Sequence, residues 1–252
     1  QEAGRAEVRR EDVDAALQAK KDREGVYVKR MREIYEKGIF SVQTADTAVG
    51  QVNGLAVSGP MGIILRTTGR AFAGKKGVVA IDQGAGMLGP TATKATANIG
   101  GALAAEIGGV LMEKVEIHLS YEQSYGGVEG DSASMTQYIA ALSALSGVPI
   151  KQNLAITGSL DQWINTQAIG GANEKIEAFF ALCKVRGLTG DQGVIVPKTN
   201  VADLQLSPEI VQAVREGKFH IYAVENVRQA AELLTGTAYA ALIAQARTSA
   251  AA

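Results

Sequence analysis

Strands and helices alternate through the second half of this 252-residue chain. Short apolar segments typical of buried strands occur three times, as LAITGSL (154–160), GVIVP (193–197) and FHIYAV (219–224). Segments with helical spacing follow them, namely NEKIEAFFALCKVR (173–186), SPEIVQAVREG (207–217) and VRQAAELLTG (227–236). Because such alternation places helices against a sheet, we predict an α/β (α+β) fold in which helices pack on mixed sheets.

The first half divides into an appendage and the start of the main domain. Residues 1–40 are rich in charge and helical in pattern, so we expect one or two surface helices there. The main domain is predicted to span 41–236. We expect the glycine-rich residues 84–90 to form a mobile loop. We expect the Ala-rich residues 237–252 to form a C-terminal tail that is partly disordered or vector-derived.

Four strands and two helices are expected in the first half of the main domain. The expected strands are 48–59, 61–69, 77–82 and 115–121, and the expected helices are 91–107 and 132–145. The first two strands are joined by a Gly59-Pro60 turn.

Composition narrows the class of protein. Hydrophobic residues make up 46% of the chain and the formal net charge is -1, which favours a soluble domain and gives no sign of nucleic-acid or membrane binding. Cys183 is the one cysteine, so no internal disulfide can form and a reducing, cytoplasmic location is expected. We do not expect Cys183 to be catalytic, because it shares a helix face with Phe179 and Phe180 and is predicted to have a buried, apolar role.

A candidate nucleophile, Ser132, lies in the motif GDSAS, where a loop meets an expected helix. Free backbone N–H groups and the positive end of the helix dipole meet at such a point, and they can hold the negative oxygen of an acyl-transfer intermediate. The alternative is a purely structural role, in which Asp131 or Ser132 is only the N-cap of the helix.

A serine nucleophile needs a base. Neither His118 nor His220, both at alternating strand positions, has an evident orienting aspartate. Lys175 is the other candidate, because it follows two glycines and enters a helix with an apolar face. Burial and the helix dipole would both favour its neutral amine. The alternative is a solvated surface lysine.

Four blocks together resemble the proteolytic domain of Lon proteases. They are VGQVNGLAV (49–57), VEGDSAS (128–134), ITGSL (156–160) and IGGANEKIEA (169–178), in the family's order. The candidate serine and lysine are 43 residues apart, which also fits the family. The EGDSAS form looks like the B-type branch or its ATPase-deficient C-type relatives, and residues 1–40 resemble the end of an ATPase lid subdomain.

The resemblance implies a role for each site residue. Ser132 would attack the peptide carbonyl and Lys175 would act as its base. Thr157 would orient the lysine amine, and His118 and Asp131 would support the site. The resemblance also implies a cytoplasmic homohexamer that hydrolyses unfolded or damaged proteins in protein quality control.

An extended substrate is expected to pair beside the approach to the nucleophile, residues Gly126, Gly127, Val128 and Glu129. The alternative function is a non-catalytic Lon-like scaffold or assembly domain. Such relatives typically lack one member of the Ser–Lys dyad, whereas this chain has both.

One segment resembles a phosphate-binding loop. In GRAFAGKK (69–76) Lys76 stands where Ser or Thr is needed, and the next segment reads as a strand, not a helix. We therefore expect no cofactor in this chain and no metal, with ATP involved only if the full-length protein carries an ATPase domain.

Overall fold

The computed structural model describes residues 7–252, except the side chains at 17, 18, 20–24, 26–29, 31 and 32. The chain divides into two compact units between Phe40 and Ser41. In its described part, from residue 7 onward, the first unit contains one helix, α1 (Arg10–Glu36). The Asp12 carboxylate accepts the Arg9 amide at 2.9 Å at the start of this helix. Within the described residues, no helix is both long and apolar enough to cross a membrane.

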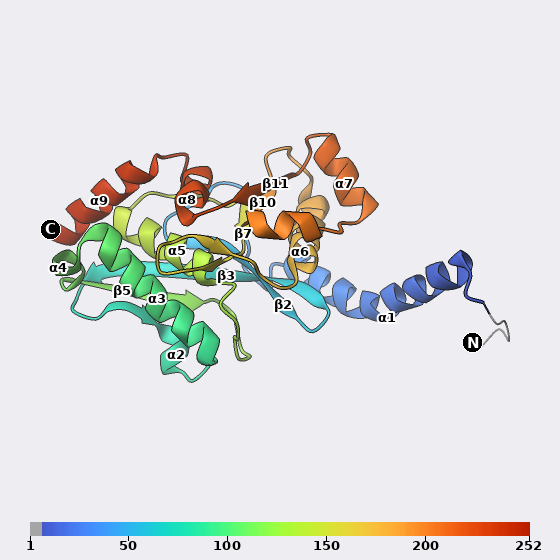
Figure 1. Cartoon of the computed structure of the whole chain (residues 1–252), viewed down its shortest axis with the longest axis horizontal. Coiled ribbons are helices and arrows are strands. Elements are labelled where there is room, and N and C mark those ends of the chain that lie inside the picture. The colour runs from blue at the N-terminus through green and yellow to red at the C-terminus, as the bar shows by residue number, and fades with distance from the viewer. Residues whose placement is uncertain (1–6) are drawn as a thin grey trace. The chain divides into compact units, whose positions relative to one another are not determined.

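A seven-stranded mixed sheet forms the centre of the second unit, in the order β11-β10-β7-β2-β3-β5-β4 (Figure 1). Its strands are β2 (Gln51–Ser58), β3 (Met61–Ala73), β4 (Gly77–Ala80), β5 (Val115–Tyr121), β7 (Leu154–Ile156), β10 (Gly193–Pro197) and β11 (His220–Val224). Strand β3 runs antiparallel to β2 and β5, whereas β2, β7, β10 and β11 are mutually parallel. The mixed sheet predicted from the sequence is confirmed.

Two small two-stranded sheets complete the strands. They pair β1 (Thr47–Ala48) with β6 (Ile150–Lys151) and β8 (Ser159–Leu160) with β9 (Thr166–Gln167). The helices of this unit are α2 (Ile81–Gly84), α3 (Pro90–Ile107), α4 (Gly109–Met112), α5 (Ser134–Ser146), α6 (Ala172–Arg186), η1 (Lys198–Asp203), α7 (Pro208–Arg215), α8 (Val227–Thr235) and α9 (Tyr239–Ala251).

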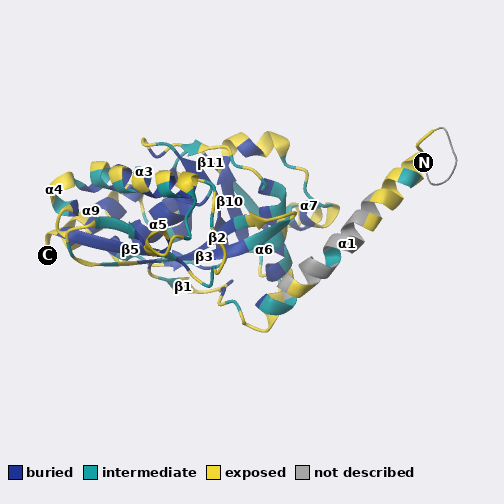
Figure 2. Cartoon of the chain, turned by 90° about the horizontal axis from the view of Figure 1, so that it is seen from below, coloured by how far each residue is buried: buried dark blue, intermediate teal, exposed yellow. Residues whose placement is uncertain are grey.

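Helices α5 and α6 pack on opposite faces of β3. A Cβ added at Gly69 would meet the Ala140 carbonyl of α5, and one added at Gly62 would meet the Glu174 carbonyl of α6. The two glycines are an odd number of residues apart in a regular strand, so they face opposite ways. Helix α5 is the most completely buried helix of this unit, and α3 and α9 also pack against it (Figure 2).

Three predicted elements differ in detail. The strand predicted at 154–160 is interrupted after Thr157. The Thr157 amide still donates to the Ile195 carbonyl of β10, but the Gly158 amide leaves the sheet and donates to the Ser132 carbonyl. The strand predicted at 61–69 continues to Ala73, within the phosphate-loop resemblance, and leads by a turn into β4, so a strand follows this segment as predicted. Residues 81–84 of the predicted 77–90 strand and loop region form the short helix α2.

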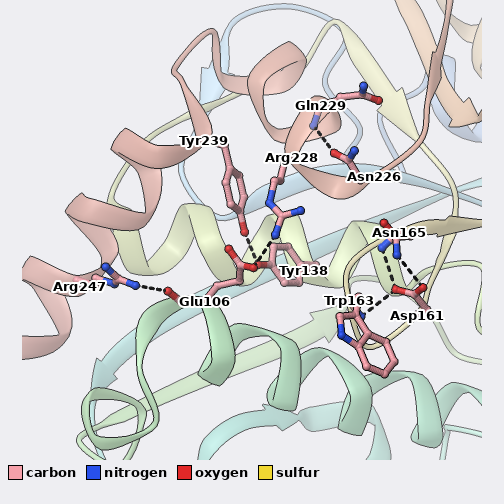
Figure 3. A network of polar contacts seen from close by, with 10 residues as sticks. All are labelled: Glu106, Tyr138, Asp161, Trp163, Asn165, Asn226, Arg228, Gln229, Tyr239 and Arg247. Atoms are coloured by element: carbon pink, nitrogen blue, oxygen red, sulfur yellow. Dashed lines mark hydrogen bonds and ion pairs between the residues drawn. The ribbon is translucent and has the colours of Figure 1, made fainter.

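The expected disorder of the Ala-rich tail is wrong. Residues Tyr239–Ala251 form helix α9, which packs against α5 through a buried apolar face. The hydroxyls of Tyr239 and Tyr138 lie within hydrogen-bond distance, 2.7 Å apart (Figure 3). Arg228 forms an ion pair with Glu106 at 2.8 Å, and its guanidinium lies 5.6 Å from the centre of the Tyr239 ring. Alanine at helical spacing therefore provides close helix contact here and not an unstructured end.

Candidate active site

Ser132 lies in the turn that leads into α5, as predicted. Its carbonyl accepts the Gly158 amide at 2.9 Å, and the Gly158 carbonyl in turn accepts the Met135 amide at 3.0 Å. The break between β7 and β8 therefore fixes the backbone on both sides of the serine. Among the described residues, no hydrogen bond uses the amides of Ser132 and Ala133, so both remain available to a ligand.

Lys175 lies in the first turns of α6 and is 1% exposed. It belongs to the stripe of α6 that faces the sheet, between Ala172 and the apolar pair Ile176 and Phe179. Burial lowers the pKa of its amine from 10.5 to about 8, although the nearby charge of Asp131 acts in the opposite direction. The alternative of a solvated surface lysine is therefore wrong.

The approach of α6 to the sheet depends on two glycines. Gly171, in the left-handed region with φ +68°, begins the helix, and a Cβ there would lie 2.5 Å from Val57. A Cβ at Gly62 of β3 would lie 1.9 Å from the carbonyl oxygen of Glu174, the residue before Lys175. Because neither glycine carries a side chain, the first turn of α6 can lie against β2 and β3.

The two candidate residues meet. The Nζ atom of Lys175 lies 3.0 Å from Oγ of Ser132, within hydrogen-bond distance. Residues that are 43 positions apart in sequence are thus joined at the end of β7, where helices from opposite faces of the sheet converge.

Two supporting residues have contacts that the sequence did not predict. Asp131 accepts a hydrogen bond from the Ser159 hydroxyl at 2.8 Å, so its carboxylate is paired beside the dyad. The Thr157 hydroxyl donates to the Ser132 carbonyl at 3.3 Å, whereas the resemblance implied that it orients the amine of Lys175. Thr157 is fully buried, and the structure places it against the backbone of the serine.

Residues 126–129, which precede Ser132, pair on one side with residues 87–89 through a parallel bridge between Val128 and Leu88. Val128 donates its amide to Met87 at 2.8 Å and accepts the Gly89 amide at 2.9 Å, so residues 87–89 lie beside it. Neighbouring residues in a strand point their amides and carbonyls to alternate sides. The backbone groups of Gly127 and Glu129 therefore face the other way, and no hydrogen bond among the described residues uses them.

Glu129 itself is turned toward helix α3. Its carboxylate accepts hydrogen bonds from the hydroxyl and the amide of Thr91, at the start of that helix. These bonds lower the pKa of Glu129. Several hydrogen bonds thus join residues 87–91 to residues 128–130, and they include residues 87 and 89 of the predicted loop.

Three other candidates lie apart from the dyad. His118 is in β5, where it bonds the Glu116 carboxylate at 2.6 Å and contacts Phe72; no contact found among the described residues joins it to Ser132 or Lys175. His220 bonds the Gly190 carbonyl. Cys183 is buried, which raises the pKa of its thiol to about 12, and the predicted apolar role is confirmed.

Sequence reasoning missed two serines, Ser134 and Ser159, whose hydrogen bonds position the segments next to the dyad. Ser134 accepts the Leu160 amide at 2.8 Å, and Ser159 bonds both Asp131 and Gln167. The Gly-Ser pair directly after Thr157 was a signal, because glycine in a strand pattern marks a bulge or a close backbone approach.

This fold and site have the arrangement that hydrolases with a serine nucleophile require: a hydroxyl beside a helix start, with a base in contact. Residues 26–235 match the family model described as Lon protease (S16) C-terminal proteolytic domain. The chain therefore belongs to the Lon protease family, and it is a proteolytic, peptidase domain of that family.

Curated relatives agree with the family match. The chain is 40% identical over 238 residues to a putative Lon protease homolog of Escherichia coli (strain K12), covering 89% of this chain and 39% of that protein. It is 35% identical over 237 residues to the archaeal Lon protease of Thermococcus kodakarensis, covering 91% of this chain and 34% of that protein. The chain thus spans between a third and two fifths of the length of these relatives.

Proposed function

We propose that this domain is a serine endopeptidase that hydrolyses unfolded polypeptides through a dyad of Ser132 and Lys175. One observation carries the proposal, namely the 3.0 Å contact between the Lys175 amine and the Ser132 hydroxyl in a place where the lysine is almost completely buried. An amine with a pKa of about 8 is uncharged in about a tenth of molecules at pH 7 and in about half at pH 8, and the uncharged form can accept a proton.

The chemistry needs two half-reactions. In the first, Oγ of Ser132 attacks the peptide carbonyl carbon while the neutral amine of Lys175 takes the hydroxyl proton. The resulting ammonium gives that proton to the leaving nitrogen, the C–N bond breaks, and an ester joins the substrate acyl group to Ser132. In the second, the same amine takes a proton from a water molecule as the water oxygen attacks the ester carbonyl carbon. The bond between that carbon and Oγ of Ser132 then breaks, the product leaves as a carboxylic acid, and the proton on the amine returns to Oγ.

The negative oxygen of each tetrahedral intermediate needs hydrogen-bond donors. The amides of Ser132 and Ala133 precede α5 and have no other hydrogen-bond partner among the described residues. They lie at the positive end of the α5 dipole, which favours negative charge. We assign the oxyanion site to these two amides, since donors that are fixed in advance stabilise developing charge most effectively.

The substrate is proposed to bind as an added strand. The backbone of Gly127 and Glu129 offers unused donors and acceptors on the side away from residues 87–89. A polypeptide can pair there only if it is extended, which favours unfolded chains over folded ones. The homohexameric assembly, cytoplasmic location and quality-control role implied by the resemblance stay predictions.

The test is cleavage of casein, an unstructured protein, by the purified chain with and without ATP. Ser132→Ala is expected to keep the fold and to lose at least about a thousandfold in rate, because the nucleophile is gone. Lys175→Arg is expected to be equally inactive, since a guanidinium stays charged. Ser120→Ala, a serine of β5 outside the site, is the matched control. Cleavage by Ser132→Ala at the wild-type rate would reject the dyad.

A further inference from the structure

The loop at the tip of the β8–β9 hairpin, residues 161–165, holds a strained conformation. Ile164 has a φ of +62°, in the left-handed region, which β-branched residues rarely adopt. Its side chain is 1% exposed and is part of the main hydrophobic core. Burial of this side chain therefore holds the loop in a backbone shape that would otherwise be unfavourable.

Hydrogen bonds fix the same loop from both sides. One oxygen of the Asp161 carboxylate accepts the amides of Trp163 at 2.8 Å and Asn165 at 2.9 Å, and the other oxygen accepts the Asn165 side chain at 3.0 Å. The Ile164 carbonyl accepts the amide of Val227, at the start of α8. Figure 3 shows Asp161 between Asn165 and Trp163, with the indole projecting away from the loop.

These contacts fix the backbone of a loop that carries an exposed aromatic side chain. Trp163 is 74% exposed, although its loop is tied to the core and to α8. It is also the one tryptophan in the chain. Exposed tryptophans held in a fixed position lose little conformational entropy on binding, and tryptophan is enriched among residues that dominate binding energy.

Each end of the hairpin leads to a residue next to the dyad, Asp131 at one end and Gly171 at the other. At one end, Ser159 bonds Asp131, the neighbour of Ser132. At the other end, β9 leads within a few residues to Gly171, whose carbonyl accepts the Lys175 amide at 3.0 Å. Four residues separate Ser159 from Trp163, so at about 3.4 Å per residue the tryptophan lies within about 14 Å of that anchor.

We propose that Trp163 is a substrate contact that receives an apolar side chain of the unfolded polypeptide bound at Ser132 and Lys175. The inference rests on the proposed endopeptidase function and names an additional subsite for it. A second copy of this chain is the competing occupant, and the experiments below separate the two.

The first experiment uses the fluorescence of the single tryptophan. Ser132→Ala protein is titrated with a reduced, unfolded polypeptide that lacks tryptophan and carries an extrinsic dye, and anisotropy of the dye reports binding. Over the same titration the Trp163 emission is expected to shift to the blue and to become less accessible to acrylamide. Unchanged emission and quenching while anisotropy shows saturation would overturn the proposal.

The second experiment measures kinetics. Trp163→Ala is expected to raise the KM for an unfolded protein by about tenfold with kcat nearly unchanged, and Trp163→Phe to restore most of the loss. Labelling of Ser132 by a small fluorophosphonate is expected to be unaffected, because such a probe does not reach the tryptophan. The control is Phe72→Ala, which removes another exposed aromatic side chain. Phe72 lies at one end of β3, whereas Gly62, which contacts α6, lies at the other end.

Outcomes for the subsite and for the endopeptidase function can be told apart. If wild-type protein cleaves the polypeptide but Trp163→Ala has an unchanged KM, the subsite is wrong and the peptidase stands. If the polypeptide binds and alters Trp163 emission but no cleavage occurs, the proposed function is wrong and the contact stands. If sedimentation shows that Trp163→Ala changes the assembly state while polypeptide binding is unaltered, Trp163 belongs to a contact between copies and the proposal fails.

Discussion

Replacing Lys175 with Met should stabilise the fold while it abolishes the proposed chemistry. Methionine has a similar length and no charge, so it suits the stripe of α6 beside Ile176 and Phe179. In the folded protein the pKa of Lys175 is lowered from 10.5 to about 8. At about 1.4 kcal/mol per pKa unit, burying the charged amine costs about 3 kcal/mol of unfolding free energy.

The sign of the effect sets its pH window. Below about pH 8 the lysine is protonated in both states, and its burial lowers the free energy of unfolding by the full amount. Between about pH 8 and 10.5 the folded protein has released the proton and the unfolded chain has not, so wild-type stability rises with pH. Above 10.5 the amine is neutral in both states and the cost disappears.

Urea unfolding at several pH values measures this directly. The stability advantage of Lys175→Met over wild type should be about 3 kcal/mol at pH 7 and should shrink steadily between pH 8 and 10.5. Lys184→Met, at an exposed position of the same helix, is the matched control and should change stability by about 0.5 kcal/mol or less at each pH. A Lys175→Met protein that is less stable than wild type, or an advantage independent of pH, would refute the reasoning.

Three further predictions concern the same site. The kcat/KM for an unfolded substrate should rise about tenfold per pH unit below pH 8 and level off above it, because only the neutral amine of Lys175 acts as base; a flat profile from pH 5 to 9 would contradict this. Asp131→Asn should move the midpoint to lower pH, since the Asp131 charge raises the pKa of Lys175, and an upward shift would count against that cause. Gly62→Ala should cost about 1–3 kcal/mol and reduce kcat, because its Cβ would meet the Glu174 carbonyl and displace Lys175; thermal unfolding and casein cleavage test this, with Gly126→Ala, where the Cβ meets nothing, as the stability control.

Much of the architecture followed from local pattern. The helix at 173–186 was predicted within one residue of α6, and the strands 115–121 and 193–197 coincide with β5 and β10. Their apolar spacing and glycine boundaries act over a few residues, so they can be read without long-range information. The position of Ser132 at a loop–helix boundary was accessible for the same reason.

Other features depended on contacts between distant segments. In the strand pattern 154–160, Gly158 signalled a break, but nothing in the sequence showed that its amide would leave the ladder to bind the Ser132 carbonyl. The Ala-rich end looked weakly structured, because small side chains bury little area alone. Helix α9 became stable only because α5 offered a closely fitting surface and Tyr138 offered a partner for Tyr239.

The sequence by itself determined most of the segments that become strands and helices, and it supplied a serine at a helix start and a lysine within an apolar stripe. It did not determine that the lysine is dry or that its amine reaches the serine, because burial and distance are properties of packed elements and not of a residue's neighbours in the chain. Tertiary structure decided both, by bringing α5 and α6 together from opposite faces of one sheet so that Lys175 lies 1% exposed and 3.0 Å from Ser132.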